Sequence, residues 1–99
     1  MKKISFKLTC EQLRYLLHWI DQWLPKLPLL NRALLTELYM HQYPRTVITW
    51  QGQRKVTMSV AQALALRELI AQVNPGYIDP YVLALVTDIY STIDQQLPV

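Results

Sequence analysis

The sequence has little of the residues that build the sites of small proteins. Its 99 residues include one cysteine, two glycines and two histidines. Because Cys10 stands alone, it cannot close an internal disulfide or form a cysteine-based zinc site. Two separate glycines are too few for a phosphate-binding loop or a dinucleotide fingerprint. We therefore expect no cofactor and no bound metal.

Acidic residues are also scarce, which argues against an enzyme. The seven Asp and Glu residues are spread singly along the chain. Asp88 and Asp94 lie six residues apart on one predicted helix, so they face different sides of it. His18 lies one turn before Asp21, but nothing in the sequence indicates the further ligands of a metal site. No catalytic residue is predicted. The one enzyme hypothesis left open is a site assembled between helices.

Long hydrophobic segments are missing as well. The basic start of the chain is not followed by an apolar stretch, because Lys7 and Glu11 interrupt it, so no secretory leader is expected. Residues 69–87 carry few charges, but prolines and a glycine interrupt them, and they cannot span a bilayer as a helix. We expect a soluble, cytoplasmic protein without a membrane partner.

What the sequence does have is apolar area. Hydrophobic residues make up 52% of the chain and charged residues 17%. Such a composition buries enough apolar area to offset the entropy of ordering, which excludes a disordered chain. The length fits a single compact domain over residues 1–99.

The first half of the chain predicts a strand followed by two helices. Polar and apolar residues alternate over residues 3–8, as in a half-buried strand. Thr9 and Gln12 form a capping-box pattern, which predicts a helix from there to about Leu24. A second helix is predicted from residue 29 or 31 to Gln42, between prolines. Its expected inward positions are Leu30, Ala33, Leu34 and Leu38. Leu35, Tyr39 and Met40 widen this stripe, so the helix is expected to be buried on more than one side.

Two further helices are predicted in the second half. Ser59 and Gln62 repeat the capping-box pattern, and a helix should run from there to Val73. Asp79 followed by proline is a strong helix start, because Asp is a favoured N-cap and proline suits the first helical position. The last helix should run over residues 80–96.

A β-hairpin is predicted ahead of these helices. Residues 46–50 and 55–58 are rich in β-formers, and Gly52 between them can supply the positive φ of a hairpin turn. The order is then β-α-α-β-β-α-α. This is an α+β fold, in which four helices pack on a small antiparallel three-stranded sheet.

The two halves also show a weak repeat at an offset of 50 residues. The match fails where Ile4 and Leu17 correspond to Arg54 and Arg67. Since any two capped strand–helix units look alike, duplication is a hypothesis at this point. The matching residues are Phe6, Leu8, Thr9, Gln12, Leu16 and Ile20 with Val56, Met58, Ser59, Gln62, Leu66 and Ile70.

Positive charge gathers on and beside the predicted strands, where no acid occurs. If the apolar strand residues point toward the helices, Lys3, Ser5, Lys7, Lys55 and Thr57 share the opposite face. Such a basic, hydroxyl-rich surface suits contacts to phosphates, although a solvated face that protects open strand edges is the simpler interpretation. The candidate nucleic-acid contacts are Lys3, Lys7, Arg45, Arg54 and Lys55, with Trp50 as a stacking plane.

Large aromatic residues form a second candidate surface. Tyr15, Trp19 and Trp23 are spaced four apart on the first helix, beside its leucine stripe. Nearly half of that helix is then apolar, which is more than one helix of a small domain usually buries. We expect the first and last helices to contribute to a dimer surface. The interface candidates are Tyr15, Trp19, Trp23, Tyr81 and Tyr90.

The sequence therefore favours a small non-enzymatic interaction or adaptor protein. Its expected partner is a second copy of the chain, in a homo-oligomer, or another protein. The alternative is a nucleic-acid-binding protein that uses the basic sheet and hairpin. These hypotheses differ in their response to salt, because phosphate contacts weaken steeply as salt rises.

Overall fold

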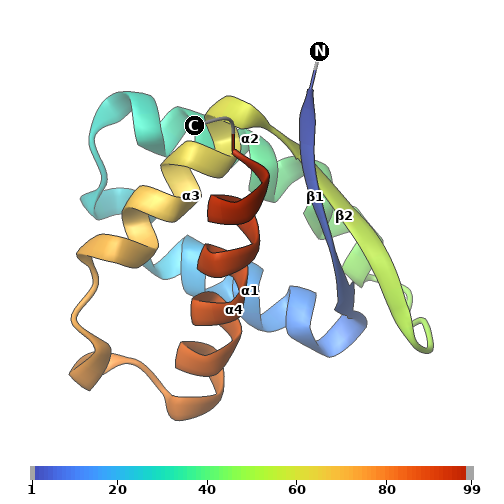
Figure 1. The fold of residues 1–99 in the computed structure, drawn as a ribbon. Helices are drawn as coiled ribbons and strands as arrows, with labels where there is room; N and C mark the ends of the chain where they lie inside the picture. The colour runs from blue at the N-terminus through green and yellow to red at the C-terminus, as the bar shows by residue number, and fades with distance from the viewer. Residues whose placement is uncertain (1, 98–99) are drawn as a thin grey trace.

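The chain folds into two strand–helix–helix units. A computed structural model describes residues 2–97, and Figure 1 shows β1 and β2 running side by side along one flank while α3 and α4 lie on the other. The α+β class and the four helices are confirmed. The first unit holds β1 (Lys3–Thr9), α1 (Cys10–Trp23) and α2 (Leu29–Gln42), and the second holds β2 (Gln53–Ser59), α3 (Val60–Gln72) and α4 (Pro80–Gln96).

Both predicted capping boxes are present, and they set where α1 and α3 begin. The Thr9 hydroxyl accepts from the Gln12 backbone N–H at 3.1 Å, and the Gln12 side chain accepts from the Thr9 backbone N–H at 2.9 Å. Ser59 and Gln62 make the same two bonds at 3.0 and 3.1 Å. Each box satisfies amides that a helix start leaves without partners, so strand and helix join without a loop.

Short 3-10 turns separate the remaining elements. The turn η1 (Leu24–Lys26) follows α1 at a proline, and η3 (Pro75–Tyr77) lies before α4. Asp79 caps α4 by accepting from the Tyr81 backbone N–H at 2.9 Å, as predicted.

The predicted hairpin, and with it the three-stranded sheet, is wrong. The sheet has two strands, and the order is β-α-α-β-α-α. Residues 46–50 form no strand. Thr46 ends the turn η2 (Tyr43–Thr46), and Ile48 is 78% exposed. Arg14 on α1 donates to the Thr46 carbonyl at 2.7 and 3.1 Å. This contact holds Thr46 against α1, and residues 46–50 take no part in the strand pairing.

The strands β1 and β2 instead pair with each other across the two units. The pairing is antiparallel, with Phe6 opposite Val56 and Ile4 opposite Met58. Ile4, Val56 and Met58 are buried toward the helices, while the alternate residues face outward. The expected assignment of the two faces is therefore confirmed.

The register is the one that two equivalent units would produce. Residues 50 apart, Phe6 and Val56, lie directly opposite each other. A local two-fold axis at that pair would exchange every residue of β1 with the residue 50 positions later in β2. The second helices follow at an offset of 51, where buried Leu35 and Leu38 correspond to buried Val86 and Ile89. The arrangement supports the repeat hypothesis.

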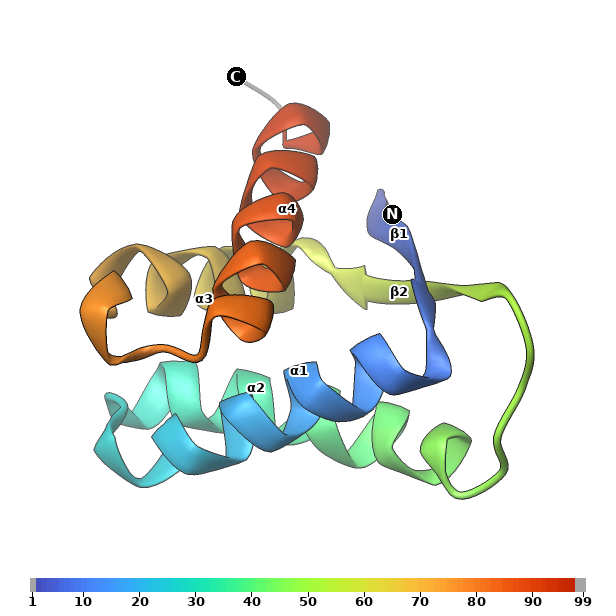
Figure 2. The same cartoon turned by 90° about the horizontal axis from the view of Figure 1, so that it is seen from below.

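The helices build the core behind the sheet. Figure 2 shows α1 and α2 side by side, with α4 running across their direction. The inward positions predicted for α2 are wrong in part, because Leu30 is 70% exposed and the buried line runs through Leu35, Leu38 and Gln42. Over residues 2–97, no helix combines the length and apolar character needed to cross a membrane.

Candidate functional site

Glutamine side chains occupy both edges of the two-stranded ribbon. Gln96, the last residue of α4, accepts from the Ser5 backbone N–H at 3.1 Å and donates to the Ser5 carbonyl at 2.6 Å. Gln42, the last residue of α2, donates to the Thr57 carbonyl at 3.3 Å. These bonds cover polar groups that an edge strand would otherwise offer to another chain. Side chains from the ends of α4 and α2 thus occupy the edge backbone groups of Ser5 and the Thr57 carbonyl.

The outer face of the ribbon is entirely polar, and we refer to it as the ribbon face. Every second residue of each strand contributes to it, because side chains alternate across a strand. It holds three lysines, one glutamine and four hydroxyl residues, and no acidic residue. Its members are Lys3, Ser5, Lys7 and Thr9 from β1, and Gln53, Lys55, Thr57 and Ser59 from β2.

Two lysines of the ribbon face oppose each other. Lys7 lies directly across from Lys55. The backbone groups of Ser5 and Thr57 point away from each other. That pair and the Lys7–Lys55 pair, two residues along, are therefore non-hydrogen-bonded pairs, in which side chains come closest. Like charges so placed destabilise a sheet by about 0.2–1 kcal/mol.

In the part of the chain that the structure describes, no carboxylate forms a salt bridge with these lysines. Within residues 2–97 the one salt bridge joins Arg67 to Asp94, at 2.8 Å. Glu37 and Asp88 line small cavities beside Lys3 and Lys7, but neither forms an ion pair with them. Within the described residues, the lysines of the ribbon face therefore have no carboxylate paired with them.

Two arginines and a tryptophan gather at one end of the ribbon. Arg45 and Arg54 lie over the Trp50 ring, at 5.8 and 5.1 Å from its centroid. Trp50 is only 7% exposed, and its Nε1 has no hydrogen-bond partner. The ring is thus covered by the two guanidinium groups and does not present an open face to solvent. Arg45 also donates to the Gln42 side chain at 2.9 Å.

The structure thus sorts the six candidate nucleic-acid contacts into two groups. Lys3, Lys7 and Lys55 share the ribbon face. Arg45, Trp50 and Arg54 form the cluster at its end. Arg54 lies opposite Leu8, so it is not part of the ribbon face itself.

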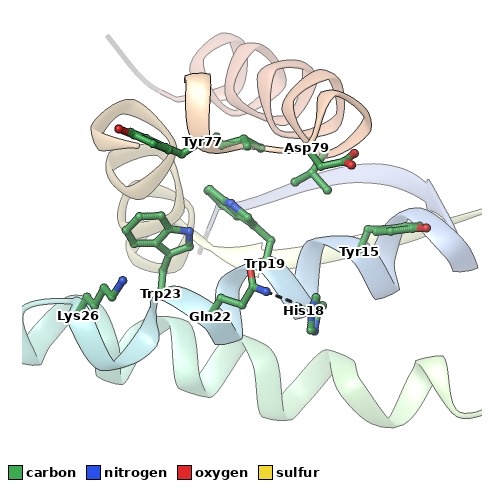
Figure 3. Close-up of a pocket in the computed structure, with 10 residues that line it drawn as sticks. Tyr15, His18, Trp19, Gln22, Trp23, Lys26, Tyr77 and Asp79 are labelled. Atoms are coloured by element: carbon green, nitrogen blue, oxygen red, sulfur yellow. Dashed lines mark hydrogen bonds between the residues drawn. The ribbon is translucent and has the colours of Figure 1, made fainter. Parts of the chain in front are cut away.

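Aromatic residues border the exposed side of α1. A cleft of about 450 Å³ lies between α1 and the segment before α4. Figure 3 shows the rings of Trp19 and Trp23 rising from α1 toward the segment that carries Tyr77 and Asp79. A second cleft of about 370 Å³ lies on the other side of His18. Six of the ten aromatic residues line the two clefts: Tyr15, Trp19, Trp23 and Tyr77 in the first, and Tyr39 and Tyr43 in the second.

The candidate interface residues are only partly brought together. Tyr15 packs against Tyr81 with ring centroids 5.0 Å apart, beside Trp23 and the buried Trp19. Tyr90 is half-buried elsewhere on α4 and lines neither cleft. Tyr39, Tyr43 and Tyr77 were not predicted as interface residues. The sequence indicates them only through its high number of tyrosines, because their grouping depends on how segments distant in the sequence pack.

Two of these tyrosines have perturbed acidities. Desolvation, then the carboxylate of Asp21 and the neighbouring Tyr43, raise the pKa of Tyr39. Desolvation, then Glu11 and Tyr15, raise the pKa of Tyr81. Both phenols are therefore neutral around pH 7 and can act as hydrogen-bond donors.

Neither surface gathers the groups of a metal centre. Within the part of the chain that the structure describes, no three His, Cys, Asp or Glu side chains lie close enough to hold a metal ion. Comparisons with family models, with curated proteins and with solved structures gave no significant match to this chain. The ribbon face thus offers ammonium, hydroxyl and amide groups for ionic contacts and hydrogen bonds. The surface around α1 offers aromatic rings.

Proposed function

We propose that this protein binds double-stranded DNA through the ribbon face. The observation that carries the proposal is the composition of that face. Its eight residues can all donate hydrogen bonds, three of them are lysines, and none is acidic. Among residues 2–97, the opposed Lys7 and Lys55 form no salt bridge with a carboxylate. The repulsion between these two lysines destabilises the free protein, so the pair is not explained by stability. A bound polyanion would neutralise both charges and remove the repulsion.

The dimensions of the ribbon suit the major groove. Two paired strands lie about 4.8 Å apart, and seven residues extend over about 20 Å. The major groove of B-DNA is about 12 Å wide and admits a two-stranded ribbon, and it displays a distinct donor and acceptor pattern for each base pair. Proteins that read DNA with β-strands use the grooves in this way.

Duplex DNA fits the surface better than other nucleic acids. Binding of single strands relies on exposed aromatic rings that stack on bases, but Trp50 is buried and the ribbon face has no aromatic residue. Double-stranded RNA has a deep, narrow major groove that side chains cannot read. Hydroxyl, amide and ammonium groups on a narrow ribbon favour the wider groove of DNA.

The arginine cluster would contact the DNA backbone beside the groove. Arg45 and Arg54 lie at one end of the ribbon, near where phosphates would flank an inserted strand pair. Phosphate contacts position a protein on the duplex, whereas base contacts specify the sequence. Together with Lys3, Lys7 and Lys55, five cations are available. If each neutralised one phosphate, log Kd would change with log salt with a slope of about 4.5 in magnitude.

Fluorescence anisotropy of labelled duplexes tests this proposal. Binding should be measurable at low salt and should weaken steeply between 50 and 200 mM salt, about the range over which phosphate contacts respond. Lys55→Glu should abolish most of the binding. Lys26→Glu makes the same charge change at the α1–α2 connection, which Figure 2 shows far from the strands, and should leave most of it. Equal losses in the two variants would contradict a specific role of the ribbon face.

We also propose that the protein self-associates through the side of α1 that the aromatic clefts border. Tyrosine and tryptophan are enriched at the centres of protein interfaces. The exposed ridge of α1 between the clefts carries Glu11, Arg14, His18 and Asp21. An antiparallel second copy would place Arg14 near the partner's Asp21, and the reverse, as a two-fold interface requires. The charge pattern thus supports a second copy as the occupant.

Sedimentation at micromolar concentration tests this second proposal. A mass of twice 11.6 kDa is expected, and Tyr15→Ser with Tyr81→Ser should return the chain to a monomer. Leu64→Ser, at the equivalent exposed surface of α3, serves as the control and should leave the dimer intact. A monomeric mass for the unchanged chain would overturn self-association without touching the DNA proposal.

A further inference from the structure

We infer that the duplex preferred by the ribbon face is not a palindrome, because the two ends of the ribbon carry different chemistry around its local two-fold axis. This inference rests on the proposed DNA binding. It goes further by naming the class of duplex: a site of two unlike half-sites.

The asymmetry follows from the register. The local axis passes through the Phe6–Val56 pair. On one side of it Lys7 lies opposite Lys55, and on the other side Ser5 lies opposite Thr57. One end of the ribbon therefore presents two ammonium groups next to the axis, and the other end presents two hydroxyls. A ribbon built from two identical strands would show the same groups at both ends, and would match a palindrome.

The difference extends to the outer positions. Beyond the lysine pair lie Thr9 and Gln53, and beyond the hydroxyl pair lie Lys3 and Ser59. Lysine pairs with the O6 and N7 acceptors of guanine, and glutamine with the N6 and N7 atoms of adenine. Serine and threonine can form hydrogen bonds with either base. The half-site under Lys7 and Lys55 should therefore favour guanine, with adenine near Gln53. The half-site under Ser5 and Thr57 should be less selective next to the axis.

The fold keeps this asymmetry in place. The edges of the ribbon are held by Gln96 at Ser5 and by Gln42 at Thr57, which fixes the register. Because both strands belong to one chain, each binding unit contains one β1 and one β2. The unlike half-sites are therefore read in a fixed order.

Selection from a pool of randomised duplexes, followed by sequencing, tests the inference. The full chain should enrich a motif whose two halves differ, with guanine concentrated in one half. A variant carrying Gln53→Lys, Lys55→Ser and Thr57→Lys gives β2 the lysine–serine–lysine order of Lys3, Ser5 and Lys7, and should enrich a palindrome. Gln53→Lys alone has the same net charge as this triple variant and should still enrich an asymmetric motif. Cooperative thermal unfolding and an unchanged circular dichroism spectrum would show that the variants fold.

Affinities for designed duplexes give a second readout. Two palindromes are made from the enriched motif by duplicating one half or the other. The full chain should bind at least one of them about tenfold or more weakly than the original, as expected for mismatched base pairs. In a two-fold dimer each ribbon would still cover its own asymmetric stretch, so the inference concerns the stretch of duplex under one ribbon. A palindrome within that stretch for the unchanged chain, or an identical motif for the triple variant, would overturn the inference. Binding without any motif would also overturn it and leave DNA binding standing, whereas no binding of any duplex at low salt would overturn both.

Discussion

The two strand–helix–helix units share a frame but differ in what they place on it. Thr9 with Gln12, and Ser59 with Gln62, make the same capping box 50 residues apart. Yet Tyr15, Trp19 and Trp23 of α1 correspond to Ala65, Leu69 and Val73 in the second unit. The shared residues are those that begin helices and fill the core. The differing residues are aromatic on α1 and aliphatic at the equivalent positions of the second unit.

The buried ends of α2 and α4 differ in a second way. Gln42 is buried and bonds both the Thr57 carbonyl and Arg45. The corresponding residue of α4 is the fully buried Ile93, and the strand edge is reached one turn later by the half-buried Gln96. The strand edge is thus occupied by the buried Gln42 in one unit and by the half-buried Gln96 in the other. Substitutions at equivalent positions can show how far this equivalence goes.

The largest expected effect tests the shared core. Leu16 and Leu66 are equivalent residues of α1 and α3, and both are fully buried. Leu16→Ala and Leu66→Ala should each lower the free energy of unfolding by about 2–5 kcal/mol, since each leaves a cavity. Urea unfolding followed by tryptophan fluorescence measures both. If one variant lost stability and the other did not, the two units would not be equivalent parts of one core.

Substitutions of the two glutamines at the strand edges should lower stability by different amounts in the two units. Gln42→Leu removes a buried amide that bonds the half-buried Thr57 carbonyl and Arg45, and should cost about 1–3 kcal/mol of unfolding free energy. Gln96→Leu should cost less, because water can reach the Ser5 backbone. The same urea series gives both values. Equal losses would show that burial does not distinguish the two edges.

The capping boxes should again show equivalence. Thr9→Ala and Ser59→Ala should each cost about 1 kcal/mol, the usual value of an N-cap side chain. Thr9 and Ser59 lie at opposite ends of the ribbon, so the losses should add in the double variant. Chemical unfolding of the three variants checks this. A double variant that lost much more than the sum would indicate that the two caps are coupled through the sheet.

The smallest effect concerns the ribbon face and has the opposite sign. Lys55→Thr removes the repulsion with Lys7 and should raise the free energy of unfolding by up to about 1 kcal/mol. The same variant should bind duplex DNA more weakly and with a shallower salt slope. Thermal unfolding and anisotropy on one preparation measure both. A variant with lower stability and unchanged affinity would show that Lys55 serves the fold and not a ligand.

The sequence predicted the locally determined features of this fold. Capping boxes, the Asp79–Pro80 start of α4 and the alternation over residues 3–8 depend on neighbours a few positions away, and all are present. The hairpin over residues 46–58 failed because strand pairing is not local. β propensity marked residues 46–50, but the contact of Arg14 with Thr46 and the pairing of β2 with β1 decided the outcome.

The candidate sites show the same division. The alternation in the two strands was enough to place Lys3, Lys7 and Lys55 on one face. That Lys7 opposes Lys55 could not be derived, because it depends on the register between strands about 50 residues apart. Trp50 looked like a free stacking plane, and only the positions of Arg45 and Arg54 show that it is covered. Tyr77 lines the aromatic cleft because the segment before α4 packs next to α1, and the sequence does not indicate this packing.

The segment of residues 47–52 is the sole covalent connection between the two units, and its main consequence is one of concentration. A short tether keeps the two halves close together, and short linkers give effective concentrations of the order of millimolar. Assembly of the ribbon is therefore independent of how much protein is present. A chain cut within this segment would consist of two fragments whose pairing follows mass action. Dilution would then dissociate the two fragments and separate β1 from β2. Each fragment would also be free to pair with a copy of itself. The tether thus sets the stoichiometry of the ribbon as one β1 to one β2.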